Sequence, residues 1–550
     1  MYKLLLSSRY LRTRFIALAS IISVMLGVAT MIVVNSVMAG FSGQMKDRLH
    51  NILADLMVES VSSDGFENPQ DLIRAIEEIA GDRIEAITPV VEIYGMLSFD
   101  FDDAQLTQPV TIVGIMPRGK DLVSPMREYL MSRQAIMEDG QVVRQPLRGM
   151  DEELNWELTE QAAKHRAEWL EWQRLNLQFR DTGSLRRPNP AMTTAQMNAD
   201  AESSETDGSL ESLVDSSNPF DVNTDLVDTG DVPPGGLFGP GFEPEIPADP
   251  NAPLPARVYV ACNLVSYQYR HGETGKMQTA MLLHPGEDVK LTTVTTGTPE
   301  PARFAATVVD IFKSGMSEYD STLVFCNLAE LQFARKMLLR RPESEDDWVN
   351  GTVTSLQIKL NDYADAPLVV RDLLQRLPGV DRGRFQIRTW EEKQGALLQA
   401  VEVESSILNV LLFLIIAVAG FGRLAIFYMT GVEKRGDSGI LKALGAGSNG
   451  VMSIFLAYGL GLGVVGSGVG VVLGLVFVWK INEIEDVLSW VTGHKVFDET
   501  IYYFDSIPTD VQPAMVMWVA VRAMAIAVPA SVLPARRAAR LDPVQALRYE

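Results

Sequence analysis

The chain has 550 residues, of which 47% are hydrophobic and 21% are charged, and its formal net charge is −22 at pH 7. The apolar residues concentrate in a few long runs and most acidic residues lie between these runs, which predicts a membrane protein with a large polar domain. The strong negative charge argues against nucleic acid as a partner.

The first apolar run, residues 15–39, contains no charged residue. At a rise of 1.5 Å per residue, about 25 residues cross a hydrocarbon core of roughly 30 Å. A cleaved leader would have a shorter apolar core. We therefore predict a first membrane span here, after a cytoplasmic N-terminal segment at residues 1–14.

A β-α-β order follows the first span and recurs near residue 350. Apolar residues repeat at helical spacing in Pro69–Ala80 and again in Ala366–Leu377, and an extended pattern lies on each side of both helices. The repeat predicts one split ferredoxin-like α+β subdomain formed by residues 55–100 and 350–390. Coincidence is the alternative explanation for the shared order.

The insertion between the two units, residues 105–345, contains short β-rich runs separated by Gly and Pro, which predict a second, mostly β subdomain. Residues 151–180 are highly charged and carry three tryptophans. We expect a surface helix there, which either packs on its own domain or docks on a partner. Residues 188–256 contain no Lys or Arg and are rich in acidic residues and Pro, so we expect a disordered acidic loop.

Three more spans are predicted at residues 405–431, 451–480 and 514–534, which leaves residues 40–404 as one large domain outside the cytoplasm. Residues 432–450 form the loop between the second and third spans, residues 481–513 the next loop, and residues 535–550 the tail. Thr389 and Glu392 have the spacing of a capping box. We expect the helix that starts there to continue into the second span, so that it carries force between the domain and the membrane.

The basic residues near the span ends set the orientation, because Lys and Arg stay on the cytoplasmic side. The loop at 481–513 is acidic, which suits the outside. The topology has four spans, both termini in the cytoplasm and the large domain extracytoplasmic. The basic residues lie in three groups: Lys3, Arg9, Arg12 and Arg14; Lys434, Arg435 and Lys442; Arg536, Arg537, Arg540 and Arg548.

No catalytic or metal-binding motif is found in the sequence. Phosphate-binding GxxxxGK[ST], HExxH and GxSxG patterns are absent. Cys262 and Cys326 belong to no Cys or His cluster with metal-ligand spacing, and we favour free thiols over a disulfide. We therefore expect no enzyme activity, no bound cofactor and no metal site.

The loop after the second span contains a short amphipathic segment that ends at a glycine, a pattern suited to docking in the groove of a partner. A second basic and apolar stretch, residues 534–548, follows the fourth span. Together these stretches resemble the FtsX-like permease family, which includes MacB-type exporters and the LolC/LolE lipoprotein-releasing permeases. An ordinary basic loop beside a membrane is the alternative for the first stretch.

The resemblance implies that this loop rests on a separate ABC ATPase subunit, which binds the ATP, in a complex of two ATPases and two permeases. It also implies that ATP-driven motion reaches the outer domain and that the substrate does not cross the inner membrane. On this basis we assign coupling to seven residues: Glu433, Lys434, Arg435, Ile440, Leu441, Leu444 and Gly445.

The third span is rich in glycine, which lets neighbouring helices approach closely, and it has almost no polar side chain for a pore. We assign helix packing to Gly459, Gly463, Gly466, Gly470 and Gly474. Arg423 and Arg522 fall near mid-membrane, where each costs about 2.5 to 3.5 kcal/mol. Snorkelling, a shifted span boundary or an interior site would each account for them.

The leading hypothesis is an inner-membrane permease of the lipoprotein-releasing type. LolC/LolE is favoured over MacB because no MacB-type ATPase domain precedes the first span. The expected partners are the ATPase, a second copy or paralogue, membrane lipid, a lipoprotein cargo and a periplasmic acceptor. The alternatives are an FtsX-like scaffold that controls a cell-wall hydrolase, a MacB-like efflux permease, and a membrane-anchored sensor without an ATPase.

Overall fold

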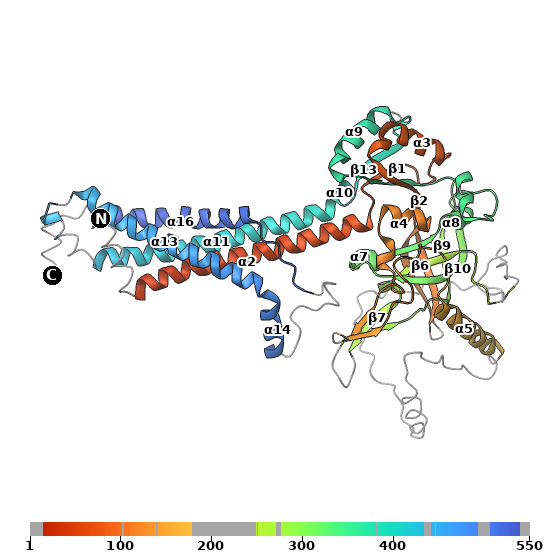
Figure 1. The fold of residues 1–550 in the computed structure, drawn as a ribbon, viewed down its shortest axis with the longest axis horizontal. Coiled ribbons are helices and arrows are strands. Elements are labelled where there is room, and N and C mark those ends of the chain that lie inside the picture. Colours follow the sequence, from red (N-terminus) through yellow and green to blue (C-terminus); the bar gives the residue numbers. More distant parts are fainter. Residues whose placement is uncertain are drawn as a thin grey trace, which may run out of the picture.

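The computed structural model has a bundle of long helices at one end and a β-rich head at the other (Figure 1). It describes residues 15–101, 104–138, 141–178, 249, 251–270, 277–380, 383–433, 440, 442–445, 447–492 and 506–539. The expected cytoplasmic N-terminal segment and almost all of the expected acidic loop at 188–256 lie outside the described residues.

Within the described residues, four long helices form the bundle: α2 (Phe15–Ile52), α11 (Gly395–Glu433), α13 (Ser448–Trp479) and α16 (Pro513–Ala539). The most extensive packing between these helices is that of α13 on α2 and of α13 on α16. Buried side chains such as Met31, Ile416 and Val519 fill the centre. Helix α14 (Ile481–Thr492) follows α13.

Three helices in the described part of the chain are long and apolar enough to cross a membrane: Ile21–Ile52, Gly395–Gly422 and Ser448–Trp479. The predicted fourth span lies in α16, whose apolar part, Pro513–Ile526, is shorter. Helices α2 and α11 pack against each other and both run on into the head (Figure 1).

The two β-α-β units lie together at the top of the head. The first consists of β1 (Leu56–Ser60), α3 (Pro69–Ala80) and β2 (Ile84–Phe101), and the second of β12 (Ser355–Leu360), α9 (Ala366–Arg376) and β13 (Phe385–Thr389). Their strands pair antiparallel in the order β13-β1-β12-β2. Helices α3 and α9 lie side by side (Figure 1), and their apolar faces are buried.

The long strand β2 belongs to both parts of the head. Its first half pairs with β12, and its second half pairs with β3 (Ala104–Ile115) and β9 (Asp288–Val294). The order continues through β11 (Leu323–Asn327), β6 (Arg257–Ala261) and β10 (Pro301–Phe312), which pairs with β9. The β2–β9 pairing therefore closes these strands into a ring, which leaves them no free edge.

Shorter elements surround the ring. The helices are α4 (Pro117–Val123), α5 (Glu160–Gln178), α7 (Ser317–Asp320), α8 (Leu328–Ala334) and α10 (Trp390–Lys393). Two hairpins are formed by β4 (Ile136–Glu138) with β5 (Gln141–Arg144) and by β7 (Ser266–Arg270) with β8 (Met277–Met281). Single 3-10 turns occupy Gly81–Arg83, Met126–Tyr129, Cys262–Leu264, Glu345–Asn350 and Tyr363–Asp365.

The helix expected to run unbroken from Thr389 into the second span is interrupted. The capping box is present, but it starts only the one-turn helix α10. Gln394 leaves helical geometry, and α11 begins at Gly395 and then continues through Glu433. The side chain of Gln394 donates a hydrogen bond to Tyr319 Oη over 2.6 Å. This tertiary contact, next to a glycine of low helix propensity, accounts for the break.

The expected charged helix also begins later than predicted, at Glu160 rather than near Asp151. Trp156 lies before it, buried in the head and stacked on Tyr259 with ring centroids 4.4 Å apart. Cys262 and Cys326 are free and both are buried, and burial raises the pKa of each thiol.

Candidate functional site

The segment assigned to coupling joins α11 to α13 at the end of the bundle away from the head (Figure 1). Ile440 and Leu444 are exposed, Leu444 by 80%. The amide of Leu444 donates to the carbonyl oxygen of Ile440 over 3.0 Å. Gly445 has φ +92°, a left-handed conformation suited to ending a helical turn.

The other assigned coupling residues lie at the end of α11 or follow it. Glu433 is the last residue of α11. Lys434, Arg435 and Leu441 lie outside the described residues. Two apolar side chains of the assigned set, Ile440 and Leu444, are therefore exposed to solvent, and their role in coupling stays a prediction.

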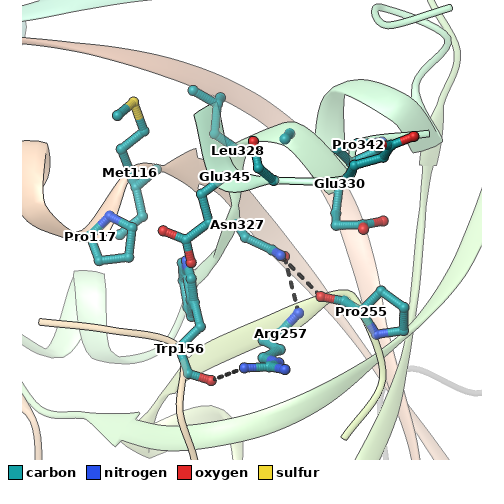
Figure 2. Close-up of a pocket in the computed structure, with 14 residues that line it drawn as sticks. Met116, Pro117, Trp156, Pro255, Arg257, Asn327, Leu328, Glu330, Pro342 and Glu345 are labelled. Atoms are coloured by element: carbon teal, nitrogen blue, oxygen red, sulfur yellow. Dashed lines mark hydrogen bonds between the residues drawn. The ribbon is translucent and has the colours of Figure 1, made fainter. Parts of the chain in front are cut away.

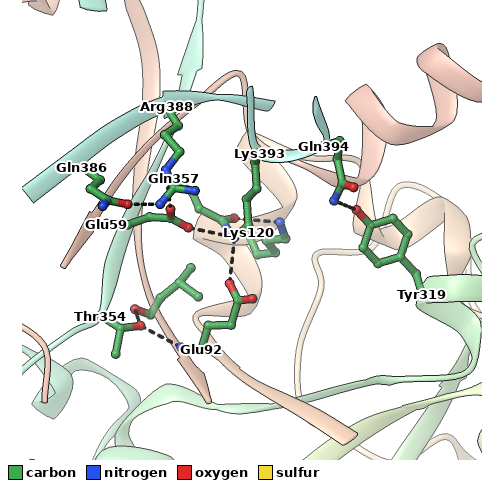
Figure 3. Close-up of polar contacts among 11 residues, drawn as sticks. Glu59, Glu92, Lys120, Tyr319, Thr354, Gln357, Gln386, Arg388, Lys393 and Gln394 are labelled. Carbon is green, nitrogen blue, oxygen red and sulfur yellow. Dashed lines mark hydrogen bonds and ion pairs between the residues drawn. The ribbon is translucent and has the colours of Figure 1, made fainter. Parts of the chain in front are cut away.

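The junction between the long helices and the head is a polar site that the sequence did not reveal (Figure 3). Lys393, at the end of α10, forms ion pairs with Glu59 of β1 over 2.8 Å and with Glu92 of β2 over 3.1 Å. Burial alone would lower the pKa of Lys393, but the two carboxylates overcome that effect, so the pKa is raised. This cation ties the start of the α10–α11 segment to two strands.

Lys120 of α4 forms a second connection at the junction. It is only 4% exposed, and its Nζ donates to Gln357 Oε1 over 2.8 Å and to the carbonyl oxygen of Ile52 over 3.3 Å. Ile52 is the last residue of α2. Burial, followed by repulsion from Lys393, lowers the pKa of Lys120 to about 7. A buried amine therefore links the head to the end of the first long helix.

His50, near the end of α2, is a third connection. It contacts the buried carboxylate of Asp55, and its ring stacks on Trp390 of α10 at a centroid distance of 5.2 Å. Asp55 also accepts from Lys359 Nζ and from the amide of Leu360. Burial opposes ionisation of Asp55, but these hydrogen bonds outweigh it and lower its pKa.

The loop that precedes and forms α7 completes the junction. Arg48 of α2 donates to the carbonyl oxygen of Gly315 over 2.7 Å, and Gln394 contacts Tyr319. The loop is held in shape by Asp320, which is fully buried and accepts from Ser314 and Gly315. Arg48 of α2 and Gln394, the residue directly before α11, therefore contact the same loop, and the junction is suited to transmitting displacement.

The glycine-rich span packs against α2. A Cβ atom on Gly470 would lie 2.8 Å from the oxygen of Met25 and 2.9 Å from Val28 Cβ. Gly466 and Gly474 face the same helix at contacts of 3.1 Å, and Gly459 and Gly463 are buried. The absence of side chains on these glycines sets the distance between the two helices.

Arg522 is exposed on α16, and Arg423 lies within α11. The side chain of Arg423 lies outside the described part of the structure.

The head also contains a cavity of about 280 Å³ between β3, β6 and α8 (Figure 2). Arg257 crosses its floor and donates to the carbonyl oxygen of Trp156 over 2.7 Å. Glu345 also lines the cavity, and burial raises the pKa of its carboxyl group. No sequence pattern indicated this cavity, because its residues come from five distant segments.

Comparison with known proteins identifies the C-terminal part of the chain. Residues 409–543 match the family model described as FtsX-like permease C-terminal. This region includes most of α11, all of α13 and α16, and the segment assigned to coupling.

Three curated relatives indicate the wider similarity. The chain is 31% identical over 252 residues to the lipoprotein-releasing system transmembrane protein LolC of Xylella fastidiosa, which covers 46% of this chain and 56% of the relative. It is 27% identical to LolE of Haemophilus influenzae over 45% of this chain and 56% of the relative. It is 28% identical to the macrolide export ATP-binding/permease protein MacB of Bdellovibrio bacteriovorus over 36% of this chain and 28% of the relative.

The chain spans about half the length of the Lol relatives that it matches. The matching family model and these similarities agree with the resemblance seen in the loop and tail motifs. Residues 409–543 of the chain therefore form an FtsX-like permease domain, and about half of the chain is similar in sequence to the transmembrane proteins LolC and LolE of lipoprotein-releasing systems.

Proposed function

We propose that the chain is the permease subunit of an ABC transporter that extracts lipoprotein, or another amphiphile, from the outer face of a bacterial inner membrane. A separate ATPase subunit binds and hydrolyses ATP, and a second permease copy or paralogue completes the membrane part. Force is transmitted through the long helices to the head, and the cargo passes to a periplasmic acceptor.

One observation carries the proposal. Two membrane-type helices, α2 and α11, lie against each other, and buried charged and aromatic groups join both to the head. A rigid junction of this kind passes a movement at the far end of the helices to the sheet. The similarity to LolC and LolE supplies the class of cargo.

The proposed topology has four spans, with α16 as the fourth. Its apolar stretch is short, but the whole helix has 27 residues and packs on α13 and α11. Both termini and the segment assigned to coupling are cytoplasmic, and the head is extracytoplasmic. Exposed Ile440 and Leu444 are then available to the ATPase.

The strand order β13-β1-β12-β2, with α3 and α9 on one face, supports a split ferredoxin-like subdomain next to the membrane. Both junction strands, β1 and β2, belong to it. A movement of α11 therefore acts first on this subdomain and then, through the shared strand β2, on the closed ring.

The proposal is tested by reconstituting the purified complex with its ATPase in proteoliposomes that contain a fluorescent lipoprotein. ATP is expected to release the lipoprotein to an acceptor. Leu444→Asp should abolish release and ATPase binding, because it places a charge on the docking surface. Leu374→Asp, on an exposed position of α9, is the matched control and should leave both unchanged.

Other outcomes would favour the alternatives. Export of a macrolide without lipoprotein release indicates a MacB-like permease. Co-purification of a cell-wall hydrolase, with ATPase binding but no release, indicates an FtsX-like scaffold. Unchanged partner binding in Leu444→Asp contradicts the assignment of the coupling segment.

A further inference from the structure

Three potential metal ligands meet where helix α5 packs on the turn between β8 and β9. His165 lies on α5, and His284 and Glu287 lie in the turn. Each side chain offers one ligand atom, and these atoms lie within 4.8 Å of one another. Glu287 Oε1 is 2.9 Å from His165 Nε2 and 3.8 Å from His284 Nδ1. Ligand atoms in a tetrahedral zinc site lie roughly 3.4 Å apart, because the metal–ligand bonds are about 2.0 to 2.2 Å.

The turn is built so that α5 approaches it closely. The amide of Glu287 donates to the carbonyl oxygen of His284 over 3.2 Å, which brings the two side chains to one side of the turn. Gly286 has φ +102°, and a Cβ atom there would lie 2.4 Å from the oxygen of Ala162 on α5. Only glycine meets both requirements. The close approach brings His165 to Glu287.

Arg166, the residue after His165, holds α5 against the turn between β8 and β9. Its buried guanidinium donates to the carbonyl oxygen of Gly286 over 2.9 Å and to Asp288 over 2.6 Å. It also donates to the carbonyl oxygens of Asn251 and Ala252. The ligands therefore stand on backbone that is fixed from both sides, which is the condition for a preorganised metal site.

The local charges favour a cation. Glu287 is 2% exposed, and burying a carboxylate is costly unless a positive group compensates it. The neighbouring charge of Arg166 is already balanced by Asp288. A divalent ion bound by Glu287 and two neutral imidazoles would place positive charge beside this buried carboxylate, in addition to the contact that it already makes with His165.

We propose that His165, His284 and Glu287 bind one Zn²⁺ ion and that this ion fastens α5 to the head. Two imidazole nitrogens and one carboxylate oxygen are borderline ligands that suit zinc, and three protein ligands leave a coordination position for water. The site lies on the part of the head away from the long helices (Figure 1). It does not depend on the proposed transport function.

The full-length chain, purified in detergent and stripped with EDTA, is dialysed against zinc and analysed for bound metal. Wild type should retain one zinc per chain that His165→Gln and Glu287→Gln lose. Glu168→Gln, an exposed position on the same helix, should retain it. Cobalt substitution should give the visible absorption of a tetrahedral site in wild type and Glu168→Gln, and not in His165→Gln or Glu287→Gln.

Thermal unfolding with and without zinc provides a second measurement that does not rely on retention. Zinc should raise the Tm of wild type and of Glu168→Gln and should leave the two ligand variants unchanged, while all four proteins melt alike without metal. Absence of bound zinc in wild type, or equal binding by the ligand variants, overturns the proposal. The cluster is then only a His165–Glu287 hydrogen bond with His284 beside it.

Discussion

Lys120 Nζ lies 3.3 Å from the carbonyl oxygen of Ile52, so a buried amine of the head contacts the last residue of the first long helix. The C-terminal carbonyl groups of a helix attract positive charge. Burial nevertheless lowers the pKa of Lys120 to about 7. The contact therefore depends on pH in the neutral range.

This dependence predicts a rise in stability with pH. A lysine in an unfolded chain has a pKa near 10.4. Between pH ~7 and ~10 the unfolded chain binds a proton that the folded chain lacks, so the free energy of unfolding rises with pH over this range. The added stability is fully present above pH ~10 and is lost as the pH falls through about 7, the pKa of Lys120 in the folded chain. The contribution of Lys120 over this range is on the order of 4 to 5 kcal/mol.

Thermal unfolding at several pH values measures this effect. Lys120→Met should flatten the alkaline rise in Tm, whereas Lys164→Met, an exposed change on α5, should keep it. Equal pH slopes in wild type and Lys120→Met would show that the amine is charged and solvated, contrary to its burial.

Lys393→Met is expected to destabilise the junction. It leaves the carboxylates of Glu59 and Glu92 without their shared cation. We expect a loss of about 1 to 3 kcal/mol, less than for a fully buried pair because Glu92 is 38% exposed. Denaturation of the detergent-solubilised chain provides the measurement.

The matched control for this change is Lys336→Met, which removes the exposed pair with Glu300. Exposed ion pairs contribute little, so the control should resemble wild type. Equal losses of stability in Lys393→Met and Lys336→Met would mean that the junction ion pairs contribute no more than an exposed pair.

Gly470→Ala should weaken the packing of α13 on α2. The added methyl group meets the backbone of Met25 at 2.8 Å, so the helices must separate. Gly468→Ala, on the same helix, meets no described atom within 4 Å and should be neutral or slightly stabilising, because alanine favours helix. Tm in detergent distinguishes them, and a lower Tm for Gly468→Ala than for Gly470→Ala would contradict the interface.

Gly286→Ala should displace α5 from the turn. The residue has a left-handed φ and its Cβ would clash with Ala162. Gly297→Ala carries a similar φ of +77° but meets no described atom within 4 Å, so it measures the backbone strain alone. Greater protease sensitivity near α5 in Gly286→Ala than in Gly297→Ala is expected. Equal sensitivity would argue against the close approach.

Local patterns in the sequence predicted the local elements well. The helix Pro69–Ala80 has the predicted bounds, because its apolar stripe begins at a proline and faces a sheet. The capping box at Thr389 is also present, but tertiary contacts of Lys393 and Gln394 end its helix after one turn. Periodicity has no information about such contacts.

The junction and the proposed metal ligands could not be predicted in this way. Lys120 and Gln357 are 237 residues apart, and His165 and Glu287 are 122 residues apart. Only the closure of the ring and the packing of α5 bring these residues together. Metal-ligand motifs of short spacing describe local segments, so they do not include a cluster drawn from two distant segments.

The central claim is that the segment assigned to coupling and the head lie on opposite sides of the membrane, joined by α2 and α11. Single cysteines placed at Leu444 and at Leu374 test it with a membrane-impermeant maleimide, because Cys262 and Cys326 are buried and burial raises the pKa of both thiols. When the outer membrane is opened and the inner membrane is intact, the account predicts labelling at 374 and none at 444 until the inner membrane is permeabilised. Equal labelling of both positions before permeabilisation would contradict it.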